Sequence, residues 1–348
     1  MDAKKRIARI YLILLVLALL GTFFSLGVGA VKVPPSDILK IILSRVPALK
    51  DKVAPTWTES HEVIILKLRL PRIILTFLVG AELSAAGVIY QGIFRNPLAD
   101  PYIIGASSGA SLGAALAILL FSGMSLLGVG PIPLFAFTGS LLTVIVVYVV
   151  AGITGRANSN TLLLSGVAVS SFISALVSFL MYFSDQKLHQ IYFWLLGSFS
   201  SQGWKEVYIN LPYGIAGFLV GLCNLRALNI FQLGENTAFF TGVDIELMKK
   251  ISLAAASLLT ASAVSVSGVI GFVGLIIPHV VRMIVGPDHR KLYPMSALAG
   301  GIYLMLADTV SRIVIAPTEL PVGILTALFG GPFFLYILMR NAKRDFRL

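Results

Sequence analysis

Long apolar stretches alternate with short polar ones along most of the chain. Eight of them have a length close to that of a transmembrane helix, which needs about 20 residues to cross a bilayer. They cover 10–30, 72–92, 102–121, 131–152, 161–183, 206–225, 294–315 and 321–339. A further stretch, 250–285, would make one helix about 50 Å long against roughly 30 Å of hydrocarbon. We expect it to break in its serine-rich middle, Ser262–Gly268. The pattern predicts an all-α polytopic membrane protein with about ten transmembrane helices, organised as a single transmembrane domain over residues 1–348.

The amino-acid composition supports a lipid environment. Hydrophobic residues make up 57% of the chain and charged residues 12%. A soluble domain carries about 25% charged residues, so this chain has too few charges to cover a surface that faces water. The net charge of +11 then indicates basic loops that face anionic lipid headgroups, and not a nucleic-acid partner. The single cysteine and the four histidines show no metal-ligand spacing, so we expect no metal site.

The distribution of Lys and Arg predicts the orientation. With both termini in the cytoplasm, sixteen of the 27 Lys and Arg fall on cytoplasmic segments, as the positive-inside rule requires. Eight of the others lie between Lys32 and Arg72, in an outer segment long enough to be translocated despite its charge. We therefore expect the N-terminus and the C-terminus inside.

Glu82 is the one acidic residue that the pattern places near the middle of a span. Burying its charge against lipid would cost at least about 2.5 kcal/mol, so Glu82 is expected to face protein or water. Three interpretations stay open: a hydrogen-bonded structural group, a group on a transport pathway, or a proton-coupling carboxylate. The lack of a matching ionisable group in another span weakens the third.

The polar connection after the sixth span predicts a docking surface. Two short amphipathic helices are expected, at about 235–241 and 244–250, with Asp244 capping the second. Phe239 and Phe240 would be exposed in such a connection. Exposed paired aromatic residues usually mark a protein partner or a membrane surface. We favour a protein partner, and a helix lying in the membrane interface is the alternative.

A series of motifs runs through nearly the whole chain. They are RLPR at 69–72, GxxxQxxxRNPLADPxxxG from Gly87 to Gly105, LLLSGVA at 162–168, LGENTAFFTGV at 233–243, GFVGLIIPHVVR at 271–282, DHR at 288–290, ADTVSR, and ELPVGILTALFGGPFF. In order and spacing this set resembles the FecCD/BtuC-type permease subunits of ABC importers for iron-siderophores, haem or vitamin B12.

The resemblance implies the type II ABC importer permease fold and a set of partners. A second copy of the chain would complete a homodimer around the substrate path. Two ATP-binding subunits would dock on the cytoplasmic side and an extracytoplasmic substrate-binding protein on the other, in the cytoplasmic (inner) membrane of a prokaryote. The chain has no phosphate-binding loop. It is therefore expected not to be an enzyme and to bind no cofactor, with ATP and Mg on the partner ATPase.

The resemblance also implies roles for individual residues, although none is catalytic. The side chains expected to receive acidic groups of the binding protein are Arg69, Arg72 and Arg312. Within a coupling loop at about 230–248, the residues expected to contact the ATPase are Leu233, Gly234, Glu235, Asn236, Thr237, Ala238, Phe239, Phe240, Thr241 and Gly242. The cytoplasmic gates would be formed by Asn96, Leu98, Asn158, Ser159 and Asn160, and Glu82 is a candidate for the pathway.

The implied function is that of the transmembrane permease subunit of an ATP-driven importer. It would translocate a metal chelate (ferric siderophore, haem or cobalamin) delivered by the binding protein. The alternative is an ion-coupled secondary transporter of a small solute, which needs several intramembrane ionisable groups where the sequence offers one. A membrane-embedded enzyme would need a convergent polar constellation, and the sequence shows none.

Overall fold

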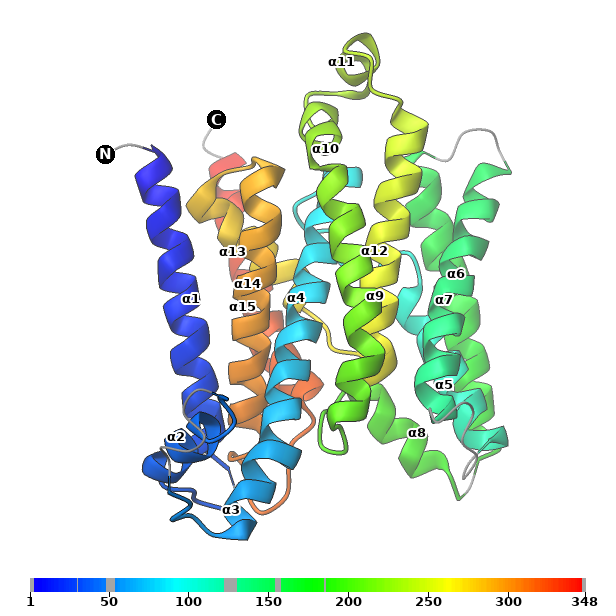
Figure 1. Cartoon of the computed structure of the whole chain (residues 1–348). Coiled ribbons are helices and arrows are strands. Elements are labelled where there is room, and N and C mark those ends of the chain that lie inside the picture. Colours follow the sequence, from blue (N-terminus) through cyan, green and yellow to red (C-terminus); the bar gives the residue numbers. More distant parts are fainter. Residues whose placement is uncertain are drawn as a thin grey trace.

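The computed structural model describes residues 3–29, 31–47, 54–121, 130–153, 158–184 and 186–345. Within these ranges every regular element is a helix, and the helices pack side by side into a bundle (Figure 1). In chain order they are α1 (Ala3–Gly27), α2 (Pro35–Leu43), α3 (Glu59–Val63), the π-helix η2 (Ile64–Arg69), α4 (Leu70–Ile93), α5 (Ala106–Leu120), α6 (Pro131–Gly152), α7 (Ser159–Tyr182), α8 (Leu188–Leu195), α9 (Trp204–Cys223), α10 (Leu225–Phe231), α11 (Glu235–Phe240), α12 (Ile245–Ser267), α13 (Val273–Val285), α14 (His289–Ser311) and α15 (Val322–Asp345).

Among the described residues, six helical segments are long and apolar enough to cross a membrane. They are Lys5–Gly27, Glu59–Ile93, Pro131–Gly152, Ser159–Tyr182, Trp204–Cys223 and Ile245–Ser267. The helices α5, α13 and α15 carry shorter apolar stretches, and α14 has 23 residues. Each apolar stretch of the sequence falls on one of these helices, or on two in the case of 250–285, so the predicted all-α, membrane-spanning class is confirmed.

The helix α4 is largely buried among its neighbours. Glycines let these neighbours approach its backbone: a Cβ on Gly80 would run into the backbone of Gly300 in α14, and one on Gly87 into that of Gly274 in α13. Lipid gives helices no hydrophobic drive to associate, so close approach of this kind supplies the packing energy. At these four positions the small residues serve tight packing.

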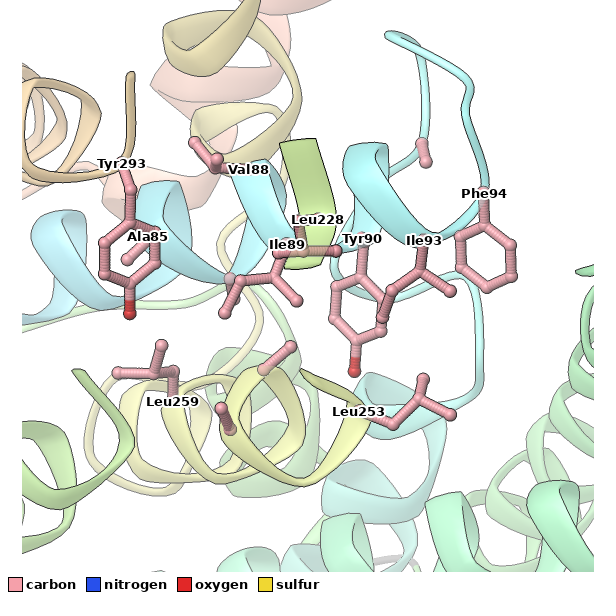
Figure 2. Packing of buried hydrophobic residues seen from close by; sticks show 14 of the residues in the cluster. Ala85, Val88, Ile89, Tyr90, Ile93, Phe94, Leu228, Leu253, Leu259 and Tyr293 are labelled. Carbon is pink, nitrogen blue, oxygen red and sulfur yellow. The ribbon is translucent and has the colours of Figure 1, made fainter. Parts of the chain in front are cut away.

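A hydrophobic cluster joins α4 to helices that follow it much later in the chain. Figure 2 shows Ile89 and Tyr90 of α4 close to Leu228 of α10, with Leu253 and Leu259 of α12 beneath them. All of these side chains are at least nine-tenths buried. The short helix α10 is therefore packed directly on the central helix, which positions the segment that follows it.

The backbone leaves helical geometry between α12 and α13. Gly268 has a φ of +70°, which ends α12. Polar groups of other segments bond the irregular backbone: the Ser198 N–H donates to the Ser267 carbonyl at 2.9 Å, and the Tyr102 hydroxyl donates to the Ile270 carbonyl at 3.0 Å. At membrane depth, non-helical backbone is tolerated where protein satisfies it in this way. The predicted break within 250–285 is present, but it begins at Gly268, the last residue of the predicted stretch, and Ser262–Ser267 remain helical.

The two ends of the bundle carry different elements (Figure 1). The α11 end, around Glu235–Phe240, also carries both termini, whereas α2, α3 and α8 lie at the opposite end, which we call the α3 end. The prediction of a separate helix at 244–250 is wrong. Asp244 does cap a helix there, accepting from the Leu247 N–H at 3.0 Å, but these residues are the first turns of the long helix α12.

Candidate functional site

The α10–α11 segment (Leu225–Phe240) is fixed at its base. The helix α10 buries its apolar face, with Leu228 in the cluster of Figure 2. Just after α10, the Gln232 side chain donates to the Gly92 carbonyl in the last turn of α4 at 2.9 Å. Apolar packing and a hydrogen bond thus connect the base of the segment to the C-terminal end of α4.

The tip of the segment is apolar and exposed. Gly234, with a φ of +117°, turns the chain into α11. Phe239 and Phe240 expose 69% and 84% of their surface, and Ala238 between them and the turn is buried. The predicted exposure of the two phenylalanines is confirmed. An exposed pair of large apolar side chains beside charged groups is typical of a surface that binds another molecule.

Charged groups connect α11 to the start of α12. The Lys249 ammonium lies 2.7 Å from the Glu235 carboxylate. This hydrogen bond lowers the pKa of Glu235, so the carboxylate is charged at neutral pH. Lys249 and Arg95 also lie 5.3 Å from the centre of the Phe231 ring. A displacement of α11 would therefore be transmitted to α12 as well as to α10.

The two segments predicted as gates meet at the α11 end. The Ser159 hydroxyl donates to the Ile93 carbonyl at 3.3 Å, which joins the start of α7 to the end of α4. Asn158 caps α7, and the Asn96 side chain accepts from the Leu98 N–H at 2.9 Å to form a tight turn. The structure thus brings the two segments together, and their role as gates stays a prediction.

At the α3 end, Arg72 is enclosed by carboxylates of its own chain. Its guanidinium donates to both oxygens of Asp308, at 2.8 and 2.9 Å, and to Glu319 at 2.8 Å. Arg72 and Asp308 are buried, whereas the Glu319 side chain is 36% exposed. Paired, planar contacts of this kind are the strong form of the arginine–carboxylate interaction.

The other two outer arginines are also buried and bonded within the chain. Arg69 donates to the carbonyl of Leu26, in the last turn of α1, and to that of Val31, which follows α1. Arg312 donates to the Ser25 carbonyl at 3.1 Å, and its Nε lies 3.5 Å from Asp308. Arg69, Arg72 and Arg312 expose only 6%, 7% and 6% of their surface. Their internal role is clear from these contacts, and docking of a binding protein stays a prediction.

Glu82 lies in a closed polar cluster between three helices. Its Oε2 accepts from the Asn210 amide of α9 at 2.9 Å, and the same amide donates to the Ser262 hydroxyl of α12 at 2.8 Å. Gly214 of α9 makes room for the carboxyl group, because a Cβ there would run into Oε1. Glu82 exposes 4% of its surface. Of the three interpretations, these contacts favour the hydrogen-bonded structural group.

Sequence reasoning did not find the partners of these buried groups. The i, i+4 spacing of Asp308 and Arg312 is compatible with an ion pair, and that pair is present. The sequence does not indicate that Asp308 bonds Arg72 at shorter distances, nor that Glu319 shares the same guanidinium. The motifs contain both acids, ADTVSR and ELPVG, but nothing in them indicates which arginine they contact.

Spanning helices, with an exposed helical tip at one end of the bundle and a buried ion cluster at the other, define a multi-pass membrane protein. The sequence matches the FecCD transport family over residues 15–340, so the chain belongs to that family of ABC transporter permeases.

Relatives and a solved structure agree with this assignment. The cobalamin import system permease protein BtuC of Halobacterium salinarum is 48% identical over 286 residues, which are 82% of this chain and 76% of the relative. The hemin transport system permease protein HmuU of Yersinia pestis is 41% identical over 81% of this chain and 84% of its own. A solved metal-chelate type ABC transporter in an inward-facing conformation has a TM-score of 0.81 at 34% identity, over 96% of this chain and 99% of that one.

Proposed function

We propose that this protein is the transmembrane permease subunit of an ATP-driven importer of a metal chelate. The class of cargo rests on the relatives, whose names specify cobalamin, hemin and Fe(3+) dicitrate. Since these cargoes differ in size and charge, we assign selection within the class to a substrate-binding protein that delivers the chelate.

The proposed topology has ten transmembrane helices with both termini in the cytoplasm. Both termini lie at the α11 end (Figure 1), as an even number of spans requires. The excess of Lys and Arg on the segments of this end supports a cytoplasmic location under the positive-inside rule. The chain would then carry the type II ABC importer permease fold in the inner membrane of a prokaryote.

The observation that carries the proposal is an exposed apolar tip on a firmly packed base. Phe239 and Phe240 offer a contact surface, while Leu228 and Gln232 connect the segment to α4. In the proposed mechanism, a separate ATPase binds α11 and moves it when ATP and Mg bind to that ATPase. The motion passes through α10 and α12 to the inner end of α4, where the gate segments meet.

The proposed assembly contains two copies of this chain, two ATP-binding subunits and one binding protein. At the outer side, carboxylates of the binding protein would contact the region of Arg69, Arg72 and Arg312. Because all three are already bonded, docking would have to exchange partners. Glu319 is the most accessible of the acidic partners, so an incoming carboxylate would take its place on Arg72.

An ion-coupled secondary transporter is the second candidate, and the structure offers it little support. Such a transporter needs an ionisable group that reaches the transport path. Glu82 is enclosed by α9 and α12 and bonded to an amide, so its surroundings do not suggest a site that loads and releases an ion.

Copurification with the ATPase tests the proposal. The double substitution Phe239→Asp and Phe240→Asp should release the ATPase subunit, because two charges would enter an apolar interface. The matched control, Phe239→Leu and Phe240→Leu, keeps the surface apolar and should retain the complex. A complex that survives the aspartate pair intact on size-exclusion chromatography would reject α11 as the coupling segment.

A further inference from the structure

We propose that the groove between α6 and α12 binds an acyl chain of a zwitterionic membrane phospholipid, with the headgroup in the cleft beside α11. The groove has a volume of about 420 Å³ and is lined almost wholly by apolar side chains. The cleft has a volume of about 750 Å³ and contains five charged side chains. None of the residues that line the groove is among those assigned above to docking, coupling or the gates, whereas the cleft shares Asn158, Glu235, Phe239 and Gly242 with the gate and coupling assignments.

The two cavities share a boundary. Tyr148 of α6, Leu162 of α7 and Lys250 of α12 line both. Beyond this boundary the groove runs along the membrane-spanning parts of α6 and α12, between side chains such as Ile145 and Ala254. An apolar cavity that shares part of its wall with a charged one has the polarity of a single amphipathic molecule.

The size of the groove selects among apolar occupants. A helix with its side chains is about 10–12 Å across, so one turn of it fills roughly 400 Å³ or more. The groove would hold about one such turn, so a spanning helix of a second copy could insert only some of its side chains there. A flexible hydrocarbon chain can follow the groove along its length, and the surrounding bilayer supplies such chains.

The charges of the cleft select among headgroups. Its carboxylates are Glu235, Asp244 and Glu246, and its ammonium groups are Lys249 and Lys250. The Lys249 side chain is largely buried and pairs with Glu235. Lys250 and Glu246 pair at 2.6 Å, and their side chains are 51% and 65% exposed. An anionic headgroup would meet an excess of carboxylates. A zwitterionic headgroup can place its phosphate at Lys250 and its ammonium at Glu246.

Retention of phospholipid by the purified protein, measured by native mass spectrometry, tests the groove. The substitution Ala254→Trp places a large side chain in the groove from an exposed position on α12. It should lower the retained phospholipid by at least about tenfold, as expected when the burial of two or more methylene groups is prevented. The matched control is Ala216→Trp, at an exposed alanine of α9 that lies outside the groove, and it should retain lipid as the unsubstituted protein does.

A second variant separates occlusion from misfolding. Ile145→Trp narrows the groove from α6, where Ile145 is 57% exposed, and it should cause the same loss as Ala254→Trp. Undiminished lipid in both variants would overturn the site. Efficient disulfide formation between two copies that carry Ala254→Cys would also overturn it, because a second copy would then cover the groove.

The headgroup is tested by adding vesicles of phosphatidylethanolamine, phosphatidylcholine or phosphatidylglycerol to delipidated protein. The first two should be retained in preference to the third, and Lys250→Gln should weaken their retention. Preferential retention of phosphatidylglycerol would overturn the headgroup assignment. The readout is lipid retention and needs neither an ATPase nor a chelate, so its failure is distinguishable from failure of the proposed importer function.

Discussion

The candidate docking side chains are exposed at one end of the bundle and buried at the other. At the α11 end, Phe239 and Phe240 are exposed at the tip of a segment whose base is buried. At the α3 end, Arg69, Arg72 and Arg312 are buried and bonded to groups of the same chain. A side chain without internal partners can bind another molecule directly, whereas one that is buried and bonded within the chain first has to exchange partners. The exposed phenylalanines can therefore be changed with little effect on folding, whereas the buried arginines and their partners cannot.

The substitution Asp308→Ala has the largest expected effect. It removes the paired contact of Arg72 and an acidic neighbour of Arg312, and it leaves buried positive charge uncompensated. Breaking a buried ion pair on one side costs about 3–5 kcal/mol. We expect a loss of this size in the free energy of unfolding, measured by denaturant or thermal unfolding of the purified protein.

Glu319→Ala is the matched control for that prediction. It removes the half-exposed partner of the same guanidinium, and pairs that reach solvent contribute about 1 kcal/mol or less. Equal losses from the two substitutions would contradict the view that Arg72 is held mainly by its buried partner.

Gly214→Ala should have the next largest effect and tests the middle of the bundle. The new Cβ would run into Glu82 Oε1, so the carboxyl group or α9 must shift. Overpacking of this kind costs about 1–3 kcal/mol. In a Glu82→Ala background the methyl group enters vacated space, so Gly214→Ala should cost less there. Unfolding of the unsubstituted protein, the two single variants and the double variant gives the coupling energy between Gly214 and Glu82.

Gly152→Ala is the control for this cycle, because nothing lies within 4 Å of a Cβ at that position near the end of α6. It should change stability little. Additive effects of Gly214→Ala and Glu82→Ala would contradict the contact between them.

How far the sequence predicts this molecule depends on the range of each interaction. Span positions follow from the length of apolar stretches, and the break after α12 follows from serines and a glycine within one stretch. The exposure of Phe239 and Phe240 is a local property of a polar connection between spans. These features need no knowledge of which helices are neighbours, so they could be predicted.

The pairings could not be predicted, because they depend on how the helices are arranged. Arg72 and Asp308 are 236 positions apart, and Glu82 and Asn210 are 128 positions apart. The error at 244–250 has another cause. An Asp cap marks the start of a helix and says nothing of its length, so it fits a short helix at 244–250 and the long helix α12 equally well.

Asp244→Ala should have a smaller effect, confined to the α11 end. Loss of the bond to the Leu247 N–H removes an N-cap, which is worth about 1 kcal/mol. The first turn of α12 should exchange its amide hydrogens faster, while the α3 end exchanges as before. Ser or Asn at this position can still cap the helix, so Asp244→Asn should leave the exchange nearly unchanged. Faster exchange at both ends would contradict the independence of the two regions.

Glu319→Gln has the smallest expected effect on stability and tests the exchange of partners proposed for the outer arginines. The amide keeps the shape of the side chain but removes the charge that would compete with an incoming carboxylate for Arg72. Because an exposed pair is worth about 1 kcal/mol or less, the affinity of the binding protein should rise by up to about fivefold. Surface plasmon resonance with the purified complex measures this rise.

Lys67→Gln provides the control, since it changes one exposed charge on the same end of the bundle without touching Arg72. It should not raise the affinity. If Glu319→Gln does not raise it either, Arg72 serves only to hold α4 against the end of α14. The binding protein must then dock on exposed groups of the α3 end, where no exchange of partners is needed.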